Sequence, residues 1–543
     1  MTCYLGIDVG TGSARAGVFD ASGRLLGTAA QPITTYRPQT GFAQQSSAQI
    51  WAAVTDSVRE ALASAGVDAD AIGGIGFDAT CSLVVSTAQG DPVSVDPGDA
   101  PDQDVILWMD HRALGDAEAI NAIGGAPLQY VGGKISPEME LPKLRWLKRE
   151  KPDAWAQAGA FFDLPDWLVH RATGNDTRSL CSMVCKWTYL GHKGLNGEGW
   201  DDDFLTAIGL DDLTQDNHSR IGTRLAAPGQ QCGGLTDTAA QELGLRPGTP
   251  VAASLIDAHA GALGTLGVGL APGASIDGRL AVIAGTSTCH IALTSDPVFV
   301  PGIWGPYFGV VTDDLWALEG GQSAAGALLD HVIARHAAAL PLAALAQAQG
   351  CRITDLIEAH LAQMGDETAT MTHDRHVQPD FHGNRSPRAE PWRKGGTAGL
   401  TLDSGMDDLA LDYLATLQAL AYGTRHILQA MRDQGVVIDT LVVSGGLARN
   451  ALYLREHADA TGCNVVVPDQ GEPVLLGCAM LGAVAAGTQT DLPAAMAHMS
   501  GAGAVIAPRG GAIAAYHDRK YSVMQRMQDD YAAYVAIMKG TDQ

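Results

Sequence analysis

The chain has 543 residues, of which 46% are hydrophobic and 17% are charged, and its formal net charge is −25. This length predicts about two to four folded domains rather than a single core. The composition is that of a globular protein and excludes a largely disordered chain. Because so acidic a chain repels nucleic acid and anionic membrane surfaces, we expect neither as a partner.

The N-terminal segment has no basic stretch followed by an apolar one, and the chain has no run of about 18 apolar residues, so we expect neither a signal peptide nor a membrane span. The nine cysteines are scattered, which favours reduced thiols and a cytoplasmic protein. Cys181 and Cys185 are the closest pair. Since no second pair lies nearby, we interpret them as small buried hydrophobic residues rather than metal ligands.

The first twenty residues contain the most informative pattern. An apolar run ends at Asp8, a turn of glycine, threonine and serine follows, and a second apolar run begins. This pattern predicts a β-hairpin. Glycines such as Gly10 let backbone N–H groups converge on an anion, and Thr11 and Ser13 add hydroxyl donors. Asp8 is placed to hold a cation such as Mg²⁺.

An ordinary hairpin with a glycine turn explains that stretch alone equally well, because short glycine motifs give many false positives. A second copy favours the phosphate-binding interpretation. Residues 280–293 repeat the plan of strand, turn and strand half a chain further on, with Gly285 and Thr286 in the turn. Repetition over this distance indicates a duplicated domain. Two such hairpins facing each other across a cleft would clamp a nucleoside triphosphate.

The segment between the hairpins alternates helical and extended patterns. Apolar spacing predicts helices over residues 46–65, 112–123 and 141–150. Buried strands end just before Thr80 and Trp108, where α/β folds place their ligand-binding residues. A tryptophan face beside charged groups suits a sugar. A polar turn at Thr80 and a core tryptophan at Trp108 are the alternatives.

Two further residues are candidates for chemistry. Lys186 lies among apolar neighbours and is placed to bind a substrate oxygen, unless it is a surface lysine whose stem covers apolar surface. Asp257 ends an apolar run before a segment of small residues, which makes it the best candidate for a catalytic base. An aspartate in this place can instead cap the next helix. We expect the domain boundary here, with domains over residues 1–264 and 265–543.

The second half carries three more features. Glu319 ends an apolar run before a glycine turn, and a strand over residues 440–443 leads into Gly445 and Gly446. Such a junction lets backbone approach a flat ligand, whose edge Asn450 can reach. Helices are predicted over residues 323–346, 407–433 and 514–539, and the last of them has an apolar packing stripe. The polar residues 370–396 form either a loop or lid on the substrate side or a plain surface loop.

As an ordered set, these motifs resemble the FGGY carbohydrate kinases over nearly the whole chain. The matching motifs are Asp8-x-Gly-Thr-x-Ser-x-Arg15, Asp257-Ala-x-x-Gly, Gly285-Thr286-Ser287 and Gly445-Gly446-x-x-x-Asn450. Residues 108–112 and 381–387 look most like the ribulokinase and pentulose-kinase branch, which includes the D-ribulokinases. Glycerol kinases carry an Arg-Glu pair where this chain has Asp78-Ala79-Thr80, which argues against glycerol as a substrate.

The resemblance implies an α/β fold of duplicated actin-like, ribonuclease-H-like domains, in two lobes around a central cleft that binds ATP. It implies that Asp8 helps to place Mg²⁺ and that Asp257 takes the proton from the sugar hydroxyl. The implied phosphate-binding and adenine-binding residues are Gly10, Thr11, Ser13, Arg15, Gly285, Thr286, Gly445, Gly446, Leu447 and Asn450. The implied substrate contacts are Thr80, Trp108, Lys186, Asp257 and Glu319.

The function that follows is an ATP-dependent kinase acting on the terminal hydroxyl of a pentulose, with D-ribulose converted to D-ribulose 5-phosphate. L-ribulose, xylulose and a pentitol such as ribitol are alternative substrates. A nucleotide-binding structural or chaperone protein of the actin-like superfamily is an alternative of another class, since it would share the hairpins without a sugar pocket. The oligomeric state stays open, with a homodimer as one alternative.

Overall fold

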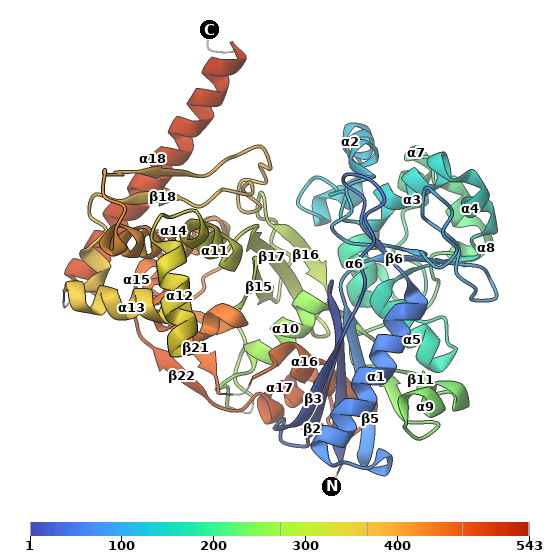
Figure 1. Ribbon diagram of the computed structural model, residues 1–543. Helices are drawn as coiled ribbons and strands as arrows, with labels where there is room; N and C mark the ends of the chain where they lie inside the picture. Colours follow the sequence, from blue (N-terminus) through green and yellow to red (C-terminus); the bar gives the residue numbers. More distant parts are fainter. Residues whose placement is uncertain (1, 272, 366, 470, 541–543) are drawn as a thin grey trace.

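The computed structural model describes residues 2–271, 273–365, 367–469 and 471–540 and has two lobes (Figure 1). Each lobe is built on a mixed sheet of seven strands. In the first sheet, β1 pairs antiparallel with β2 and parallel with β5. In the second, β14 pairs antiparallel with β15 and parallel with β20. The repeated pairing confirms the duplicated fold that the two hairpin motifs predict.

The first lobe contains residues from the N-terminal half. Its large sheet has the order β11 (Gln231–Gly234), β12 (Pro250–Ala252), β5 (Ile72–Ala79), β1 (Cys3–Val9), β2 (Ser13–Asp20) and β3 (Leu25–Pro32), with β13 (Leu255–Ile256) also on β5. Two smaller sheets are formed by β4 (Gln44–Gln45), β7 (Val105–Ile106), β6 (Leu83–Ser86) and β8 (Ala160–Asp163), and by β10 (Leu225–Ala226) and β9 (Arg178–Ser179). The helices are α1 (Ser47–Ala65), α2 (Leu114–Ile123), α3 (Glu140–Glu150), α4 (Pro152–Gln157), α5 (Leu164–Thr173), α6 (Leu180–Trp187), α7 (Asp202–Ala207), α8 (Gln215–His218), α9 (Asp237–Leu243) and α10 (Asp257–Leu266).

The second lobe repeats the plan with its own additions. Its large sheet has the order β16 (Trp304–Phe308), β17 (Trp316–Gln322), β15 (Thr288–Thr294), β14 (Arg279–Ala284), β20 (Thr440–Ser444), β21 (Asn464–Pro468) and β22 (Gly503–Ile506). A separate pair is formed by β18 (His376–Gln378) and β19 (Gly396–Ala398). The helices are α11 (Gly326–Ala334), α12 (Ala339–Gln349), α13 (Ile353–Met364), α14 (Met406–Asp433), α15 (Ala451–Thr461), α16 (Pro473–Ala485), α17 (Leu492–Met499) and α18 (Ala512–Lys539).

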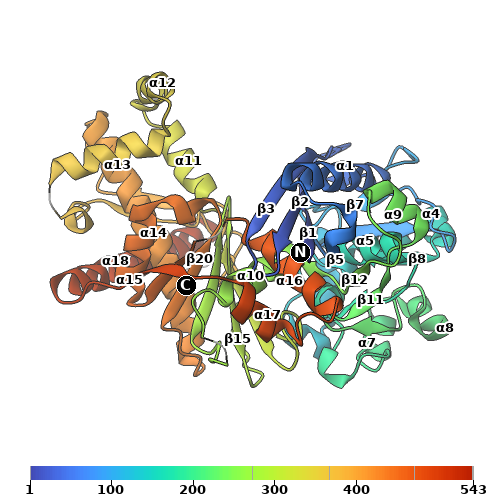
Figure 2. The ribbon, with the colours of Figure 1, turned by 90° about the horizontal axis from the view of Figure 1, so that it is seen from below.

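Two helices join the lobes. α16 comes from the C-terminal half yet contacts β1 and β5, and α10 contacts β14 (Figure 2). Glycines permit backbone-to-backbone packing here: a Cβ at Gly264 would lie 1.9 Å from the Pro473 carbonyl oxygen, and one at Gly76 would lie 2.0 Å from that of Cys478. One hydrophobic core therefore continues from the first sheet through α16 and α10 to the second.

The predicted helix over residues 323–346 is wrong in one respect, because the chain forms two helices there. α11 and α12 meet at an angle of 112°. In the break, His336 accepts the N–H of Ala338 at 3.1 Å while its other ring nitrogen lies 3.1 Å from Asp408. No single helix in the described ranges is long and apolar enough to cross a bilayer. The bent pair of α11 and α12 together would be, by length and composition alone.

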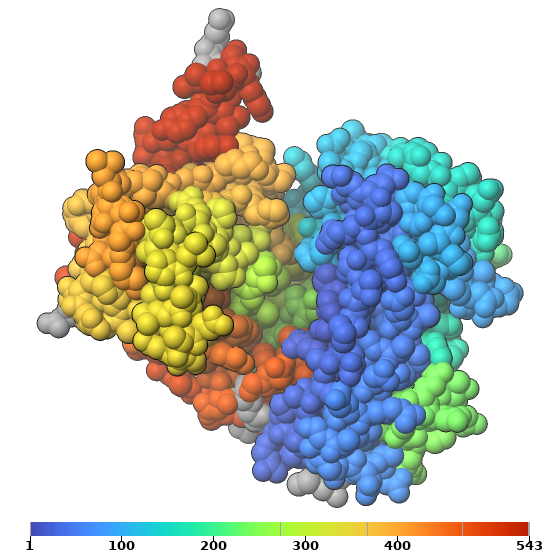
Figure 3. Space-filling model, viewed as in Figure 1, coloured from blue at the N-terminus to red at the C-terminus, as the bar shows by residue number. Residues whose placement is uncertain are grey.

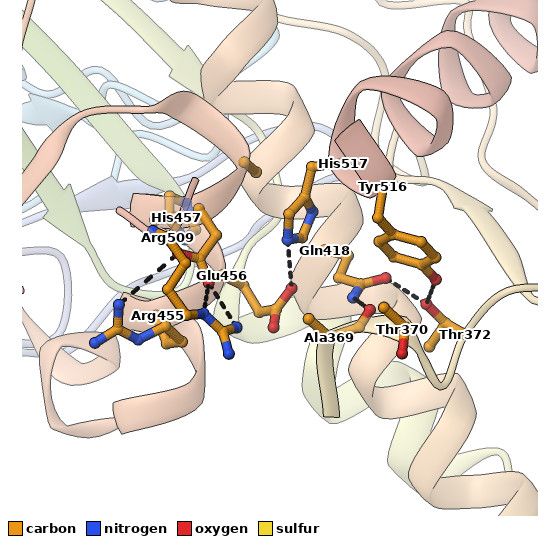
Figure 4. A network of polar contacts seen from close by, with 12 residues as sticks. Ala369, Thr370, Thr372, Gln418, Arg455, Glu456, His457, Arg509, Tyr516 and His517 are labelled. Carbon is orange, nitrogen blue, oxygen red and sulfur yellow. Dashed lines mark hydrogen bonds and ion pairs between the residues drawn. The ribbon is translucent and has the colours of Figure 1, made fainter. Parts of the chain in front are cut away.

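A buried polar network fixes the base of α18 against α14 and α15 (Figure 4). The side chain of Gln418 donates to the Ala369 carbonyl at 2.8 Å, and the Thr372 and Tyr516 hydroxyls lie 3.1 Å apart. Burial raises the pKa of Glu456 to about 8 and lowers that of His517 to about 4. These two facing groups are therefore both uncharged at neutral pH.

The far end of α18 projects from the body of the molecule (Figure 1). Tyr521 and Met524 are buried as the predicted packing stripe requires. Tyr534 and Ile537, in the same stripe, are each 59% exposed. The packing interpretation is therefore wrong for the last turns, because the helix is longer than the surface beneath it.

Candidate active site

A cleft separates the lobes and contains a cavity between them. Figure 3 shows the molecule hollowed between the blue N-terminal lobe and the yellow and orange C-terminal lobe. The cavity has a volume of about 400 Å³. Arg15 lines it from the first lobe, and Gly285, Gly445, Gly446 and Glu472 line it from the second half of the chain. Several predicted phosphate and adenine residues thus meet at one cavity.

Each hairpin turn is closed by a backbone hydrogen bond from its first glycine, but the acceptor lies three residues on in the first turn and two residues on in the second. The N–H of Gly10 donates to the Ser13 carbonyl at 3.0 Å, and the N–H of Gly285 donates to the Ser287 carbonyl at 2.9 Å. Each bond closes a three-residue connection between antiparallel strands, in which Thr11 or Thr286 is the central residue. The plan of strand, three-residue turn and antiparallel strand is therefore present in both halves, although the closing hydrogen bonds differ.

Arg15 links the two halves of the chain at the cleft. Its Nε donates to Asp8 Oδ2 at 2.7 Å, and its Nη1 donates to Glu472 Oε2 at 2.8 Å. Asp8 is buried, whereas Arg15 and Glu472 are partly exposed. The sequence motif located Arg15 and Asp8. It gave no sign of Glu472, which is 457 residues from Arg15 in the chain.

Three carboxylates interact electrostatically at the carboxyl ends of β1, β5 and β13. Asp8 and Asp78 are paired residues of the neighbouring strands β1 and β5. Burial and the charge of Asp8 raise the pKa of Asp78 well above its usual range. The Cys478 thiol donates to Asp78 Oδ2 at 2.7 Å, while Oδ1 is buried without a hydrogen-bond partner among the described residues. Asp78 was noticed in the sequence only as a departure from glycerol kinases.

Asp257 is the third carboxylate and begins α10. Burial raises its pKa to about 6, with a further contribution from the charge of Asp8, while the N–H of Ala258 and the charge of Lys186 oppose the rise. The Ala258 N–H lies 2.7 Å from Asp257 Oδ1. Such a carboxylate is ionised at neutral pH but basic enough to accept a proton. Its side chain is only partly exposed.

Trp108 connects the predicted sugar contacts to the first hairpin turn. Its indole N–H donates to Thr11 Oγ1 at 3.0 Å, and its backbone N–H donates to Ser82 Oγ at 3.2 Å. The Thr80 hydroxyl lies 3.2 Å from the same Ser82 hydroxyl. Thr80, Trp108 and Thr11 are therefore held in one hydrogen-bonded group.

Lys186 and Glu319 are brought together by a tryptophan and an arginine that no local sequence motif marks. The ammonium of Lys186 lies 4.9 Å from the centroid of the Trp304 ring, and the guanidinium of Arg385 lies 4.6 Å from it. Arg385 Nη2 donates to Glu319 Oε1 at 2.8 Å. Lys186 is buried. The group therefore combines two cations, one carboxylate and an aromatic face.

One carboxylate oxygen of Glu319, Oε2, is buried and has no hydrogen-bond partner among the described residues. Although burial opposes ionisation, the charges of Lys186 and Arg385 hold the pKa of this carboxyl below its usual value. A buried, ionised oxygen without a partner is costly unless something donates to it. A hydroxyl-rich ligand would supply that donor.

The polar stretch 370–396 contributes Arg385 to this group. The sequence showed the stretch to be unusual but could not tell which of its cations faces inward. Nothing in the sequence marked Trp304. Whether the stretch moves as a lid stays a prediction.

Leu447 and Asn450 lie beside the cavity, but they are not in its lining. The Asn450 amide accepts from the Tyr453 N–H at 2.8 Å, which caps α15, and donates to the Tyr413 hydroxyl at 2.6 Å. Leu447 is partly buried against the core of the second lobe. Contacts of these two side chains with adenine stay a prediction.

Family models match both halves of the chain. The N-terminal domain of the FGGY family of carbohydrate kinases matches residues 3–264, and the C-terminal domain of that family matches residues 280–486. The chain belongs to the FGGY family. It is an ATP-dependent carbohydrate kinase, as the motifs predict. This membership favours the enzyme over an actin-like structural or chaperone protein.

Individual FGGY relatives cover most of the chain. A human FGGY carbohydrate kinase domain-containing protein is 47% identical over 98% of this chain and 98% of its own length. The D-ribulokinase of Saccharomyces cerevisiae is 41% identical over 89% of this chain and 72% of its own length. The crystal structure of a xylulose kinase from Rhodospirillum rubrum, 21% identical over 98% of this chain and 99% of that one, has a TM-score of 0.78. The last comparison shows a shared fold.

Proposed function

We propose that this kinase transfers the γ-phosphoryl group of ATP to the terminal hydroxyl of D-ribulose and forms D-ribulose 5-phosphate. The observation that carries the proposal is the group of Lys186, Glu319 and Arg385. Its buried Glu319 carboxylate has one oxygen without a hydrogen-bond partner among the described residues and interacts electrostatically with Asp257. Its polarity suits an acceptor rich in hydroxyl groups. The 41% identity to a yeast D-ribulokinase supports D-ribulose over L-ribulose, xylulose and ribitol.

In this proposal the two hairpin turns and Arg15 bind the phosphates of ATP. Phosphoryl transfer depends on alignment and charge neutralisation more than on covalent chemistry. Backbone N–H groups at Thr11 and Thr286 and the hydroxyl of Ser13 supply donors, while Gly10 and Gly285 close the two turns. Gly445, Gly446, Leu447 and Asn450 provide the surface for adenine.

The carboxylates at the carboxyl ends of β1 and β5 fit a magnesium ion. Mg²⁺ takes oxygen ligands and is usually bound in kinases by one or two carboxylates and substrate phosphates. Asp8 is buried beside the phosphate turn, and Asp78 behind it has an oxygen without a partner among the described residues. A bound Mg²⁺ would neutralise phosphate charge, and Asp8 would help to hold it.

Asp257 acts as the general base on the acceptor. It takes the proton from the terminal hydroxyl as that oxygen attacks the γ-phosphorus atom and ADP leaves. Glu319 Oε2 accepts a hydrogen bond from one sugar hydroxyl, Lys186 donates to a sugar oxygen, and Thr80 and Trp108 close the pocket. A positioned general base contributes about 10²- to 10⁴-fold to the rate. Closure of the two lobes would exclude water from the reacting groups.

The cellular setting and domain division belong to the same proposal. The eight cysteines from Cys81 to Cys478 are free thiols, which supports the cytoplasm, where ATP is available and thiols stay reduced. We place the domain boundary between residues 264 and 265, so that Asp257 closes the first domain and the second phosphate turn opens the second. The family matches on either side of this point support the division.

The test is a panel of acceptors with the purified protein and MgATP. ADP release is measured with D-ribulose, L-ribulose, D-xylulose, ribitol and glycerol, and the phosphorylated carbon is located by nuclear magnetic resonance. We expect kcat/KM to be highest for D-ribulose and the product to carry phosphate at O5. A higher kcat/KM for another acceptor would replace D-ribulose as the proposed substrate. ADP release that no pentulose stimulates would overturn the proposal.

A further inference from the structure

Two cysteines and a histidine meet where α6 contacts α10, behind the proposed sugar pocket. Cys181 and Cys185 are one helical turn apart, which places both thiols on one face of α6. His259 is the third residue of α10. Its Nε2 lies 3.8 Å from the Cys185 sulfur. All three side chains are fully buried, and none of them has a role in the proposed kinase chemistry.

The ligand atoms of these residues have nearly the spacing of a metal site. The two sulfurs and one ring nitrogen all lie within 4.8 Å of one another. Zinc binds sulfur at about 2.3 Å and imidazole nitrogen at about 2.0 Å, so tetrahedral ligands lie roughly 3.5 to 3.8 Å apart. The Cys185 and His259 pair is already at this separation. The other distances between ligand atoms would have to shorten by about 1 Å at most to reach this separation.

His259 is not satisfied as an ordinary core histidine would be. Its Nδ1 is buried and has no hydrogen-bond partner among the described residues. Its Nε2 contacts a thiol, which is a weak hydrogen-bonding group. Buried polar atoms usually have a partner, so a buried histidine with one unpartnered ring nitrogen and only a weak thiol contact at the other needs an explanation. Cysteine sulfur and imidazole are the ligands that soft and borderline cations select.

We propose that Cys181, Cys185 and His259 bind one soft or borderline divalent cation, Zn²⁺ or Cd²⁺, and that this ion ties α6 to α10. The two thiols lose their protons to solvent as two metal–sulfur bonds form, and the neutral imidazole supplies the third ligand. Two thiolates balance the charge of a divalent ion, so the buried site stays neutral. This replaces the interpretation of the cysteines as inert hydrophobic residues.

The position of the site gives the ion a consequence for the molecule. Lys186 follows Cys185 directly on α6, and Asp257 opens α10 two residues before His259. A cation that joins these helices would fix two proposed substrate groups relative to each other. Because it binds the folded chain, it would also raise the stability of the fold. The proposal does not depend on which sugar the kinase phosphorylates.

The experiment uses the full chain, reduced and stripped of metal with a chelator, and titrates it with Cd²⁺. We expect a thiolate-to-Cd²⁺ charge-transfer band that saturates at one ion per chain, a higher unfolding midpoint, and competition by Zn²⁺. X-ray absorption at the cadmium edge should show two sulfur ligands and one nitrogen ligand. A wild-type protein with no saturable band, or with an oxygen-only shell, would overturn the proposal whether or not any variant folds.

Variants then assign the ligands. Cys181→Ser, Cys185→Ser and His259→Asn should each weaken Cd²⁺ binding at least tenfold. Cys232→Ser and Cys463→Ser remove other buried thiols and should bind as the wild type does. Far-ultraviolet circular dichroism and ATP binding report whether each variant is folded. Wild-type affinity in the folded Cys181→Ser and Cys185→Ser variants would assign the ion to other thiols and contradict the proposal.

Discussion

The pKa of about 6 at Asp257 gives the proposed base a measurable signature. Only the ionised carboxylate can accept a proton, so kcat/KM for the sugar should be level above pH 6 and fall as the pH drops through it. The fall should approach tenfold per pH unit, as for loss of one essential base. The measurement is kcat/KM against pH under conditions where MgATP is saturating. A profile that stays flat to about one unit below pH 6 would remove Asp257 from this role.

Arg385 is a positioning residue, because it holds Glu319 rather than the sugar. Arg385→Gln removes a charge-assisted hydrogen bond of about 1.5 to 3 kcal/mol, so we expect kcat/KM for the sugar to fall about 10- to 100-fold. The KM for ATP should change little. Arg385→Lys keeps the charge but loses the planar fork, so it should restore part of the loss.

Arg388→Gln is the matched control for this arginine. Arg388 lies in the same stretch but contacts Gln528 and Asp529 instead of the pocket. Its removal should leave the KM for the sugar unchanged. An equal fall in kcat/KM for the sugar in Arg385→Gln and Arg388→Gln would mean that the whole stretch matters only for folding.

At the scale of residues, the sequence could locate side chains that sit in local motifs. Asp8, Thr11 and Asp257 each follow a strand-like run, and strand ends are where ligand-binding groups gather in such folds. Trp304 and Arg385 could not be found this way. Their role arises from a contact between β16 and a distant loop, and no local spacing encodes it.

Close helix packing makes a prediction at the scale of elements. A methyl group at Gly264 would lie 1.9 Å from the Pro473 carbonyl oxygen, and neither backbone can move without displacing α10 or α16. We expect Gly264→Ala to lower the free energy of unfolding by about 1 to 3 kcal/mol or more, the usual cost of overpacking. Urea unfolding followed by circular dichroism measures this.

Gly115→Ala is the control for an added methyl group. A Cβ at this position in α2 meets no atom within 4 Å. Its effect on unfolding should be small, and the higher helix propensity of alanine makes it neutral or slightly stabilising. Equal destabilisation by both substitutions would contradict the packing argument.

Elements with a clear period were predictable from the sequence, and elements set by distant contacts were not. The apolar spacing over residues 407–433 corresponds to α14, and Ser46 caps α1 as serine commonly does. The break between α11 and α12 depends on Asp408 holding His336. The exposed end of α18 depends on where the surface beneath it stops. Neither feature can be predicted from the local spacing of apolar residues.

At the scale of the whole molecule, the repeated hairpin predicted duplication because each copy carries its own local signal. The way the halves join could not be predicted. α16 leaves its own half to lie on β1 and β5, and Arg15 pairs with a residue 457 positions away. Such contacts bring Arg15, which follows the first hairpin turn, and Gly285 of the second turn to one cavity between the lobes.

The Asp257→Asn variant tests this arrangement most directly, through ATP binding and sugar phosphorylation measured on one preparation. The amide keeps the shape of the carboxylate but cannot take the proton. Calorimetry should therefore show ATP affinity within a few-fold of the wild type, while turnover with D-ribulose falls about 10²- to 10⁴-fold. Turnover that stays within a few-fold of the wild type would contradict the account.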